Sequence, residues 1–274
     1  MNPMKKLIFL VTFCIGLLIH AAAASAQNVQ PTGKLIAQDK QSRSIYQVHA
    51  NGIDIAYKLI GSGEPLVLIT GTGGVMDRWP ESIVAQLSKK YQLIILDNRG
   101  MGLSTADDTT FTYKLYSDDV IGLLDALGVK KANVLGWSMG SLIAMELLLD
   151  HPQRILKAVL NGTSIDGSDA EQAVAGKGFT NPIILRQVTA TTHWKPSLER
   201  MQAIENQVMV IVGTADTVVG IADSKKLASI IPGVWLVQFK NATHRLMDEA
   251  PAEFTRIVLT FLEINETVGA PAPQ

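Results

Sequence analysis

Hydrophobic and polar residues alternate in one early part of the chain. The segments "SIYQVHA" and "IDIAYKLI" lie on either side of Asn51-Gly52 and together cover residues 44–60. Alternation around Asn-Gly predicts an antiparallel β-hairpin, because this dipeptide adopts the tight turn that joins two twisted strands. The preceding stretch, residues 27–43, is polar, and we expect it to be loosely held.

After the hairpin, the pattern changes to short and nearly continuous apolar runs. Such runs are typical of strands buried on both faces of a parallel sheet. Amphipathic stretches of helical period lie between them, which predicts right-handed crossovers and an open sheet covered by helices on both faces. The predicted strands are 65–70, 91–97, 132–137, 155–161, 208–213 and 234–239, and the predicted helices are 79–89, 115–128, 139–150, 222–231 and 251–264.

One interval, residues 164–206, separates two predicted strands and contains no core strand of its own. We expect it to form an insertion of one to three short helices. Insertions at the carboxyl edge of an α/β sheet tend to cover the binding crevice, so this one is expected to act as a cap. The final residues, "TVGAPAPQ" (267–274), are expected to be disordered.

The first 26 residues have the pattern of a secretory signal peptide. Lys5 and Lys6 precede thirteen apolar or small residues, "LIFLVTFCIGLLI", and Ala24-Ser25-Ala26 is a small-x-small cleavage site. An uncleaved anchor is the alternative. Thirteen residues rise only about 20 Å as a helix, however, which is short of a hydrocarbon core of about 30 Å. We therefore expect cleavage after Ala26, no stable membrane span, and export of residues 27–274 as one periplasmic or extracellular domain.

Composition narrows the function classes. Cleavage would remove two of the 24 basic residues and none of the 25 acidic ones, which leaves a net charge of about −3. That balance gives no indication of nucleic acid as a partner. The only cysteine, Cys14, lies in the signal, so the exported domain would have neither disulfides nor a cysteine nucleophile. No metal-ligand cluster or cofactor motif is present in the sequence, and we expect neither group.

The candidate nucleophile is Ser138, in "GWSMG" (136–140). A strand is predicted before this pentapeptide and a helix after it, which is the context of a nucleophile elbow. In such an elbow the serine occupies a strained turn, and glycines two residues before and after it permit close backbone contacts. The alternative is an ordinary serine cap of a helix in a glycine-containing loop.

The chain resembles the α/β-hydrolase family over almost all of residues 27–274. "DNRGMGLST" (97–105) is similar to the D-x-R-G-x-G-x-S turn of that family, and "SDDVIGLLDALGVKKANVLGWSMGS" is similar to the helix, strand and elbow of its esterase and haloperoxidase-like members. The resemblance implies a mostly parallel, eight-stranded sheet, hydrolytic chemistry, and a triad in the order serine, acid, histidine. Asp97 is interpreted as part of a structural turn.

The resemblance also guides the choice of base and acid. His244 follows the last predicted strand, where a loop at the carboxyl edge of the sheet can reach Ser138 and where the family carries its base. Asp216 lies in "GTAD" after the preceding strand and resembles the acid position of the family. Asp166, which follows the predicted strand 155–161, remains the alternative acid. The acid would hold the imidazole in the required tautomer and stabilise the imidazolium.

The oxyanion site requires two backbone donors. One is expected to be the amide of Met139, directly after the nucleophile, and the other the amide of Thr72 in "TGTGG". Members of the family usually have His-Gly where this chain has Thr70-Gly71. This departure lies in the loop whose geometry places the Thr72 amide. Four further residues are expected to line the substrate pocket: Gly71, Trp79, Trp137 and Trp194.

These features predict an exported, cofactor-free serine hydrolase that cleaves a small, largely apolar carboxylic ester through an acyl-enzyme. A lactonase or carbon–carbon bond hydrolase of the same fold is the alternative among enzymes, because the triad chemistry does not choose among these substrates. A hydrolase-fold protein that binds a small ligand without turnover is the alternative outside enzymes. The sequence leaves the oligomeric state open.

Overall fold

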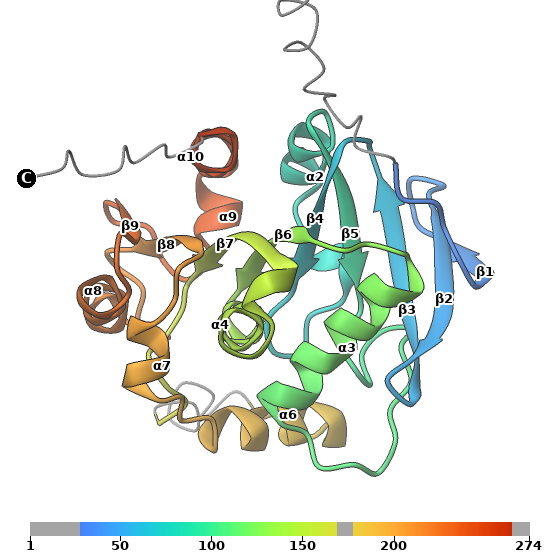
Figure 1. The fold of residues 1–274 in the computed structure, drawn as a ribbon, viewed down its shortest axis with the longest axis horizontal. Helices are drawn as coiled ribbons and strands as arrows, with labels where there is room; N and C mark the ends of the chain where they lie inside the picture. Colours follow the sequence, from blue (N-terminus) through green and yellow to red (C-terminus); the bar gives the residue numbers. More distant parts are fainter. Residues whose placement is uncertain (1–27, 169–177, 265–274) are drawn as a thin grey trace, which may run out of the picture.

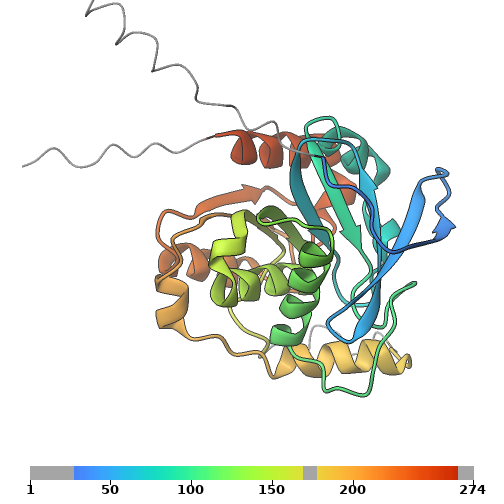
Figure 2. The same ribbon diagram turned by 45° about the vertical axis from the view of Figure 1, so that its right-hand side comes forward.

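The computed structural model describes residues 28–168 and 178–264, which form a single sheet with helices on both faces (Figures 1 and 2). The predicted signal peptide and the predicted disordered tail lie outside the described residues. The sheet has the strand order β1-β2-β3-β5-β4-β6-β7-β8-β9. Its strands are β1 (Lys34–Gln38), β2 (Ser44–Ala50), β3 (Ile53–Ile60), β4 (Glu64–Ile69), β5 (Tyr91–Leu96), β6 (Ala132–Trp137), β7 (Ile155–Asn161), β8 (Gln207–Gly213) and β9 (Trp235–Phe239).

Strand directions confirm the predicted hairpin and the mostly parallel sheet. Strands β2 and β3 pair antiparallel around Asn51-Gly52, and β3 pairs antiparallel with β5. All pairs from β5 through β4 to β9 are parallel. The chain passes from β4 to β5 on one side and then crosses to β6 on the other side of β4, so the carboxyl ends of these strands flank a switch point, where α/β sheets bind ligands.

The sheet has nine strands rather than the eight expected, because residues 34–38 form β1 instead of a loosely held segment. Strand β1 pairs antiparallel with β2 at the edge of the sheet, with a register shift between Leu35 and Ala37. Its residues are exposed or half-buried, and Leu35 is 54% exposed. Backbone hydrogen bonds to β2 hold this strand, and the half-buried Ile36 and Ala37 pack against the core, but the strand lacks the fully buried face that a hydropathy pattern detects.

Two layers of helices cover the sheet (Figure 1). On one face, residues of α3, α4 and α8 share a hydrophobic core with Val67 and Ile69, and on the other, residues of α2 and α10 share a core with Leu66 and Leu68. Successive residues of β4 thus enter opposite cores, which explains its continuous apolar run. The helices are α2 (Glu81–Leu87), α3 (Tyr113–Ala126), α4 (Met139–Asp150), α6 (Pro182–Thr192), α7 (Leu198–Gln202), α8 (Ile221–Ile230), α9 (Leu246–Glu249) and α10 (Pro251–Glu263), with 3-10 turns at Met76–Arg78 and Pro152–Arg154.

The described part of the predicted insertion contains two short helices, α6 and α7. Asn181 begins α6 by accepting hydrogen bonds from the amides of Ile183 and Ile184, and Pro182 occupies its first turn. Side chains of α6 pack against two glycine turns at the carboxyl edge of the sheet, Gly73 and Gly100. The helix therefore lies over the crevice that the strand order predicts. Within residues 28–168 and 178–264, no helix is long and apolar enough to cross a membrane.

Candidate active site

Ser138 occupies a strained turn between β6 and α4. Its backbone angles are φ 56° and ψ −124°, a conformation that side-chain-bearing residues rarely adopt. The amide of Ser138 donates to the carbonyl oxygen of Asn161 at the end of β7 (2.9 Å), and the carbonyl of Ser138 accepts from the amide of Ser141 (2.8 Å). The Ser138 side chain makes no capping hydrogen bond to α4. The hydroxyl is therefore presented to the pocket rather than used as a helix cap.

Three glycines allow the backbone to close around this turn. An ideal Cβ on Gly136 would lie 2.1 Å from the carbonyl oxygen of Gly140, and one on Gly140 would lie 2.1 Å from that of Ile69. A Cβ on Gly71 would lie 2.9 Å from the Cβ of Ser138. Real Cβ atoms essentially never come so close, so the G-x-S-x-G spacing and Gly71 are steric requirements of this geometry.

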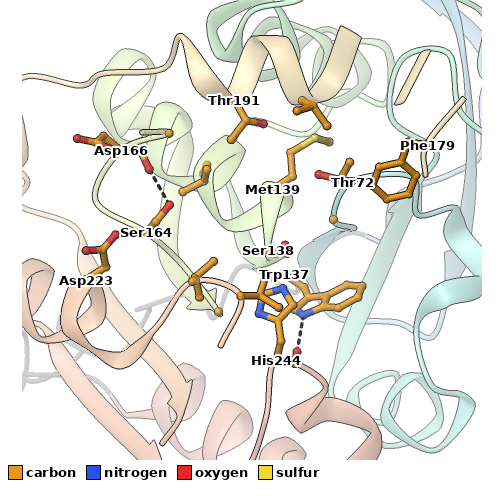
Figure 3. Close-up of a pocket in the computed structure, with 17 residues that line it drawn as sticks. Thr72, Trp137, Ser138, Met139, Ser164, Asp166, Phe179, Thr191, Asp223 and His244 are labelled. Carbon is orange, nitrogen blue, oxygen red and sulfur yellow. Dashed lines mark hydrogen bonds between the residues drawn. The ribbon is translucent and has the colours of Figure 1, made fainter. Parts of the chain in front are cut away.

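His244 lies on the loop between β9 and α9 and lines the same pocket as Ser138 (Figure 3). Its carbonyl oxygen accepts from the indole Nε1 of Trp137 (3.1 Å), and the two rings have centroids 5.7 Å apart. The guanidinium of Arg78 lies 4.7 Å from the Trp137 ring centroid and forms an ion pair with Asp248. These contacts hold the histidine loop against the residue that precedes Ser138.

The other described histidines make contacts away from Ser138. His49 contacts Asp54 in the N-terminal hairpin (2.8 Å), and His151 contacts Asp118 (3.1 Å). His193 contacts the carbonyl oxygen of Thr189 within its own helix (2.8 Å).

Asp216 lies on the loop after β8 and contacts His244. Its Oδ2 accepts from His244 Nδ1 at 2.8 Å, and its Oδ1 accepts from the amides of Val218 (2.8 Å) and Val219 (3.2 Å). Burial acts to raise the pKa of the Asp216 carboxyl, but the hydrogen bonds from His244 and the two amides outweigh it and the pKa lies below its usual value. The carboxylate is thus ionised and accepts the Nδ1 proton, which fixes the tautomer in which Nε2 is the nitrogen that can accept a proton.

The two other strand-terminal acids make different contacts. Asp166 lines the pocket, but its Oδ1 accepts from the amide of Ser168 (2.8 Å). Asp97 accepts from the amides of Met76 (2.7 Å) and Leu103 (2.8 Å), and a Cβ on Gly102 would lie 2.1 Å from Asp97 Oδ2. Asp97 thus ties two loops together, as its interpretation as a structural turn predicts. Of the two candidate acids, the structure brings Asp216 to His244.

The loop that follows β4 brings Gly71 and Thr72 to the pocket, which Met139 in the first turn of α4 also lines. The amide of Gly74 closes a turn by donating to the carbonyl of Gly71 (3.0 Å), and the Thr70 hydroxyl donates to the carbonyl of Gly74 (3.2 Å). Among the described residues, the Thr72 amide has no hydrogen-bond partner. Thr70-Gly71, which replaces the usual His-Gly, therefore begins a compact turn that the Thr70 hydroxyl closes.

The pocket is a cavity of about 170 Å³ with one apolar and one more polar end. Figure 3 shows Phe179 and Thr72 at one end and Ser164, Asp166 and Asp223 at the other. Trp137 and Gly71 line it, as expected. The described residues that line it and that sequence reasoning missed are Leu142, Gly162, Ser164, Gly167, Phe179, Val188, Thr191, Val218, Val219 and Asp223. Val218 and Val219 lie two and three residues after Asp216 on the same loop, a signal that could have identified them.

Two tryptophans expected in the pocket lie elsewhere. Trp79 is 4% exposed and packs in the core beneath α2 and α10. Trp194 is also buried, contacts the Tyr113 ring in a tilted arrangement with centroids 5.1 Å apart, and donates from Nε1 to Glu146 (2.7 Å). Both large apolar rings serve the core, and the Trp194 N–H finds a buried acceptor there. The expectation that these two residues line the pocket is therefore wrong.

Comparison with known proteins identifies the family. A model described as the alpha/beta hydrolase fold matches residues 64–180, which include the Asp97 turn and the elbow. Solved hydrolases with the same fold superimpose on the chain over almost their whole length, among them the esterase RhEst1 from Rhodococcus sp. ECU1013. The chain belongs to the α/β-hydrolase fold family. RhEst1 has a TM-score of 0.71 and 26% identity, with 80% of this chain and 98% of that one covered.

Two curated relatives of this α/β-hydrolase differ in how much they share with it. The putative non-heme bromoperoxidase BpoC of Mycobacterium tuberculosis is 38% identical over 112 residues, 40% of this chain and 42% of that protein. The chain thus matches less than half the length of that relative. A 2-hydroxymuconate semialdehyde hydrolase of Pseudomonas sp. (strain CF600) is 25% identical over 79% of this chain and 93% of that protein. The related members of the family include esterases, lactonases, carbon–carbon bond hydrolases and haloperoxidases.

Proposed function

We propose that the protein is a serine hydrolase of small carboxylic esters, with Ser138 as nucleophile, His244 as base and Asp216 as acid. The observation that carries the proposal is the 2.8 Å contact between His244 Nδ1 and Asp216, together with the pocket that His244 and Ser138 both line. Nucleophile, base and orienting acid come from three different loops at the carboxyl edge of one sheet. Such convergence of a hydroxyl, an imidazole and a carboxylate is the recognised arrangement for nucleophilic catalysis.

In the first half of the proposed reaction, Ser138 Oγ attacks the ester carbonyl carbon while His244 Nε2 takes the hydroxyl proton. Asp216 stays ionised and holds the imidazole through Nδ1, and its charge stabilises the imidazolium. The tetrahedral intermediate collapses when the bond from carbon to the alcohol oxygen breaks. His244 then returns its proton to the leaving alcohol, and the acyl group remains on Ser138.

In the second half, water attacks the acyl carbon and His244 takes a proton from it. The bond to Ser138 Oγ breaks, the serine recovers its proton from His244, and a carboxylic acid is released. In both halves the carbonyl oxygen becomes negative, and we assign its stabilisation to the amides of Met139 and Thr72. The Thr72 amide, which has no hydrogen-bond partner in the described part of the chain, and the amino end of α4 both supply positive potential at this point.

The substrate is proposed to be small and largely apolar. A cavity of about 170 Å³ suits a short acyl or alcohol group, and Leu142, Phe179, Val188, Val218 and Val219 provide an apolar lining. The test is turnover on nitrophenyl esters of two to twelve carbons and a matching lactone panel, with Ser138→Ala as control. We expect short and medium esters to react. Turnover of lactones alone would redirect the proposal to a lactonase, and binding without turnover would favour a ligand-binding protein.

We also propose that the protein is exported after cleavage behind Ala26. The support is the arrangement of Lys5, Lys6, a short apolar core and Ala24-Ser25-Ala26. Expression of the full chain in a bacterial host, followed by fractionation and mass spectrometry of the amino terminus, tests this. Periplasmic protein that begins at Gln27 is the expected product, whereas a membrane-bound product that retains residues 1–26 would show an anchor instead.

A further inference from the structure

Helix α6 of the cap places a fully buried glutamine against the loop that follows β4. Gln187 is 0% exposed, and its Oε1 accepts a hydrogen bond from the amide of Gly73 at 2.8 Å. The two residues are 114 positions apart in the sequence. On the same face of α6, Ile184 packs on Gly73 and Thr191 lies in hydrogen-bond contact with the Tyr113 hydroxyl (2.9 Å). Helix α6 is thus joined to the loop that follows β4 by one polar contact and one apolar contact.

The position of this contact within the loop gives it a specific consequence. The start of the loop is fixed because Asn98 donates to the carbonyl of Thr70 (3.1 Å), and the end is fixed by the turn between Gly71 and Gly74. Gly73 has φ +69°, in the left-handed region that glycine adopts without the steric cost a side chain would add. Holding the Gly73 amide fixes the peptide plane directly after Thr72, and so restricts how the Thr72 amide can rotate.

The chemistry of the glutamine indicates why a polar side chain stands there. Its Nε2 is buried and has no hydrogen-bond partner among the described residues. Burying an unpartnered donor is unfavourable, and a residue present only for packing would be apolar at lower cost. The oxygen, which does have a partner, is therefore the part of the side chain that the fold uses.

We infer that Gln187 is a positioning residue of the oxyanion site, which acts through Gly73 to aim the Thr72 amide at the developing charge. The inference rests on the proposed function, since it requires that Thr72 serve as an oxyanion donor. It extends that function by making the seating of the cap helix α6 a determinant of rate. Because the donor matters most when the carbonyl oxygen becomes negative, loss of Gln187 affects the transition state more than substrate binding.

The test compares Gln187→Met, which removes the acceptor at similar volume, with Gln187→Glu, which keeps an acceptor whether or not its carboxyl is ionised. Ile184→Val is the matched control, because it trims the apolar contact with the same glycine. We expect Gln187→Met to lower kcat about tenfold with KM changed less than about twofold, and to weaken a boronic acid, a mimic of the tetrahedral intermediate, by the same factor as kcat/KM. Gln187→Glu should restore most of the rate.

Two results would overturn the inference: an unchanged kcat in Gln187→Met, or an equal loss in Ile184→Val without recovery in Gln187→Glu. If the variant folds poorly by its thermal midpoint, hydrogen exchange of the Gly73 amide in Gln187→Glu decides, and exchange as fast as in unstructured peptide contradicts the role. A wild-type protein that hydrolyses no ester and binds no boronic acid refutes the proposed function itself. An active wild type with insensitive variants refutes only the role of Gln187.

Discussion

Gly162 provides a sharp test of where the imidazole of His244 must sit. This glycine follows β7, has φ +60°, and an ideal Cβ on it would lie 2.9 Å from His244 Cε1 and 3.0 Å from Nδ1. Ordinary van der Waals contact begins at 3.4 Å. In Gly162→Ala the ring must therefore move by about 0.5 Å, or the backbone of β7 must move instead, and either shift disturbs the alignment of base and nucleophile.

The magnitude follows from two separable effects. The left-handed backbone costs an alanine about 1–2 kcal/mol of stability wherever it occurs. Displacement of a catalytic group by 1 Å can cost about 100-fold in rate, so half of that shift predicts about a tenfold loss of kcat/KM. Gly128 offers a matched control, since it has φ +68° and no atom within 4 Å of its ideal Cβ. Gly128→Ala has the same backbone strain without a contact at the site.

The assay is kcat/KM on a short nitrophenyl ester, with urea denaturation of each variant. We expect both alanine variants to lose stability, but only Gly162→Ala to lose about tenfold in kcat/KM. A kcat/KM that falls equally in both variants, or in neither, would refute the placement of His244 as the base beside Gly162.

Two further predictions concern the acid. Asp216→Asn should lower kcat by about 10³–10⁴-fold, because an amide nitrogen facing His244 Nδ1 favours the wrong tautomer of the imidazole. Asp166→Asn should change kcat by less than about threefold. Steady-state kinetics of the two variants checks this, and a larger loss in Asp166→Asn would move the acid to Asp166. Because folding lowers the pKa of Asp216, its contribution to stability is present above the unfolded pKa of about 3.9 and is lost as pH falls through the folded value. Urea denaturation at pH 7 and pH 3 should therefore show a wild-type advantage over Asp216→Asn that shrinks in acid, and an advantage independent of pH would contradict this linkage.

The parts of the fold that sequence predicts well are those in which one physical signal dominates. Strand β6 and helix α4 begin and end at the expected residues, because the buried run ends at a turn that only the glycines of "GWSMG" permit. Strand β1 was missed because its side chains are exposed or half-buried, and pairing with β2 together with the partial packing of Ile36 and Ala37 holds it. Hydropathy patterns report burial, and an edge strand of this kind buries little.

The candidate site shows the same limit at the level of single residues. Sequence order places Asp216 and Asp166 on loops at the same sheet edge, but only the structure shows which of them contacts His244. Trp194 was expected in the pocket because it lies in the cap, yet its partner is Glu146 in the core. Gln187 carried no signal, since its role depends on a contact with a loop 114 residues away.

The central claim is that Ser138 is an activated nucleophile, and covalent labelling tests it most directly. The folded protein should react with a fluorophosphonate to give one adduct, which intact-mass and peptide mass spectrometry locate at Ser138. Ser138→Ala should give no adduct, and His244→Ala should react far more slowly because the hydroxyl has lost its base. A folded wild-type protein that remains unlabelled, or carries its label on another residue, would contradict the account.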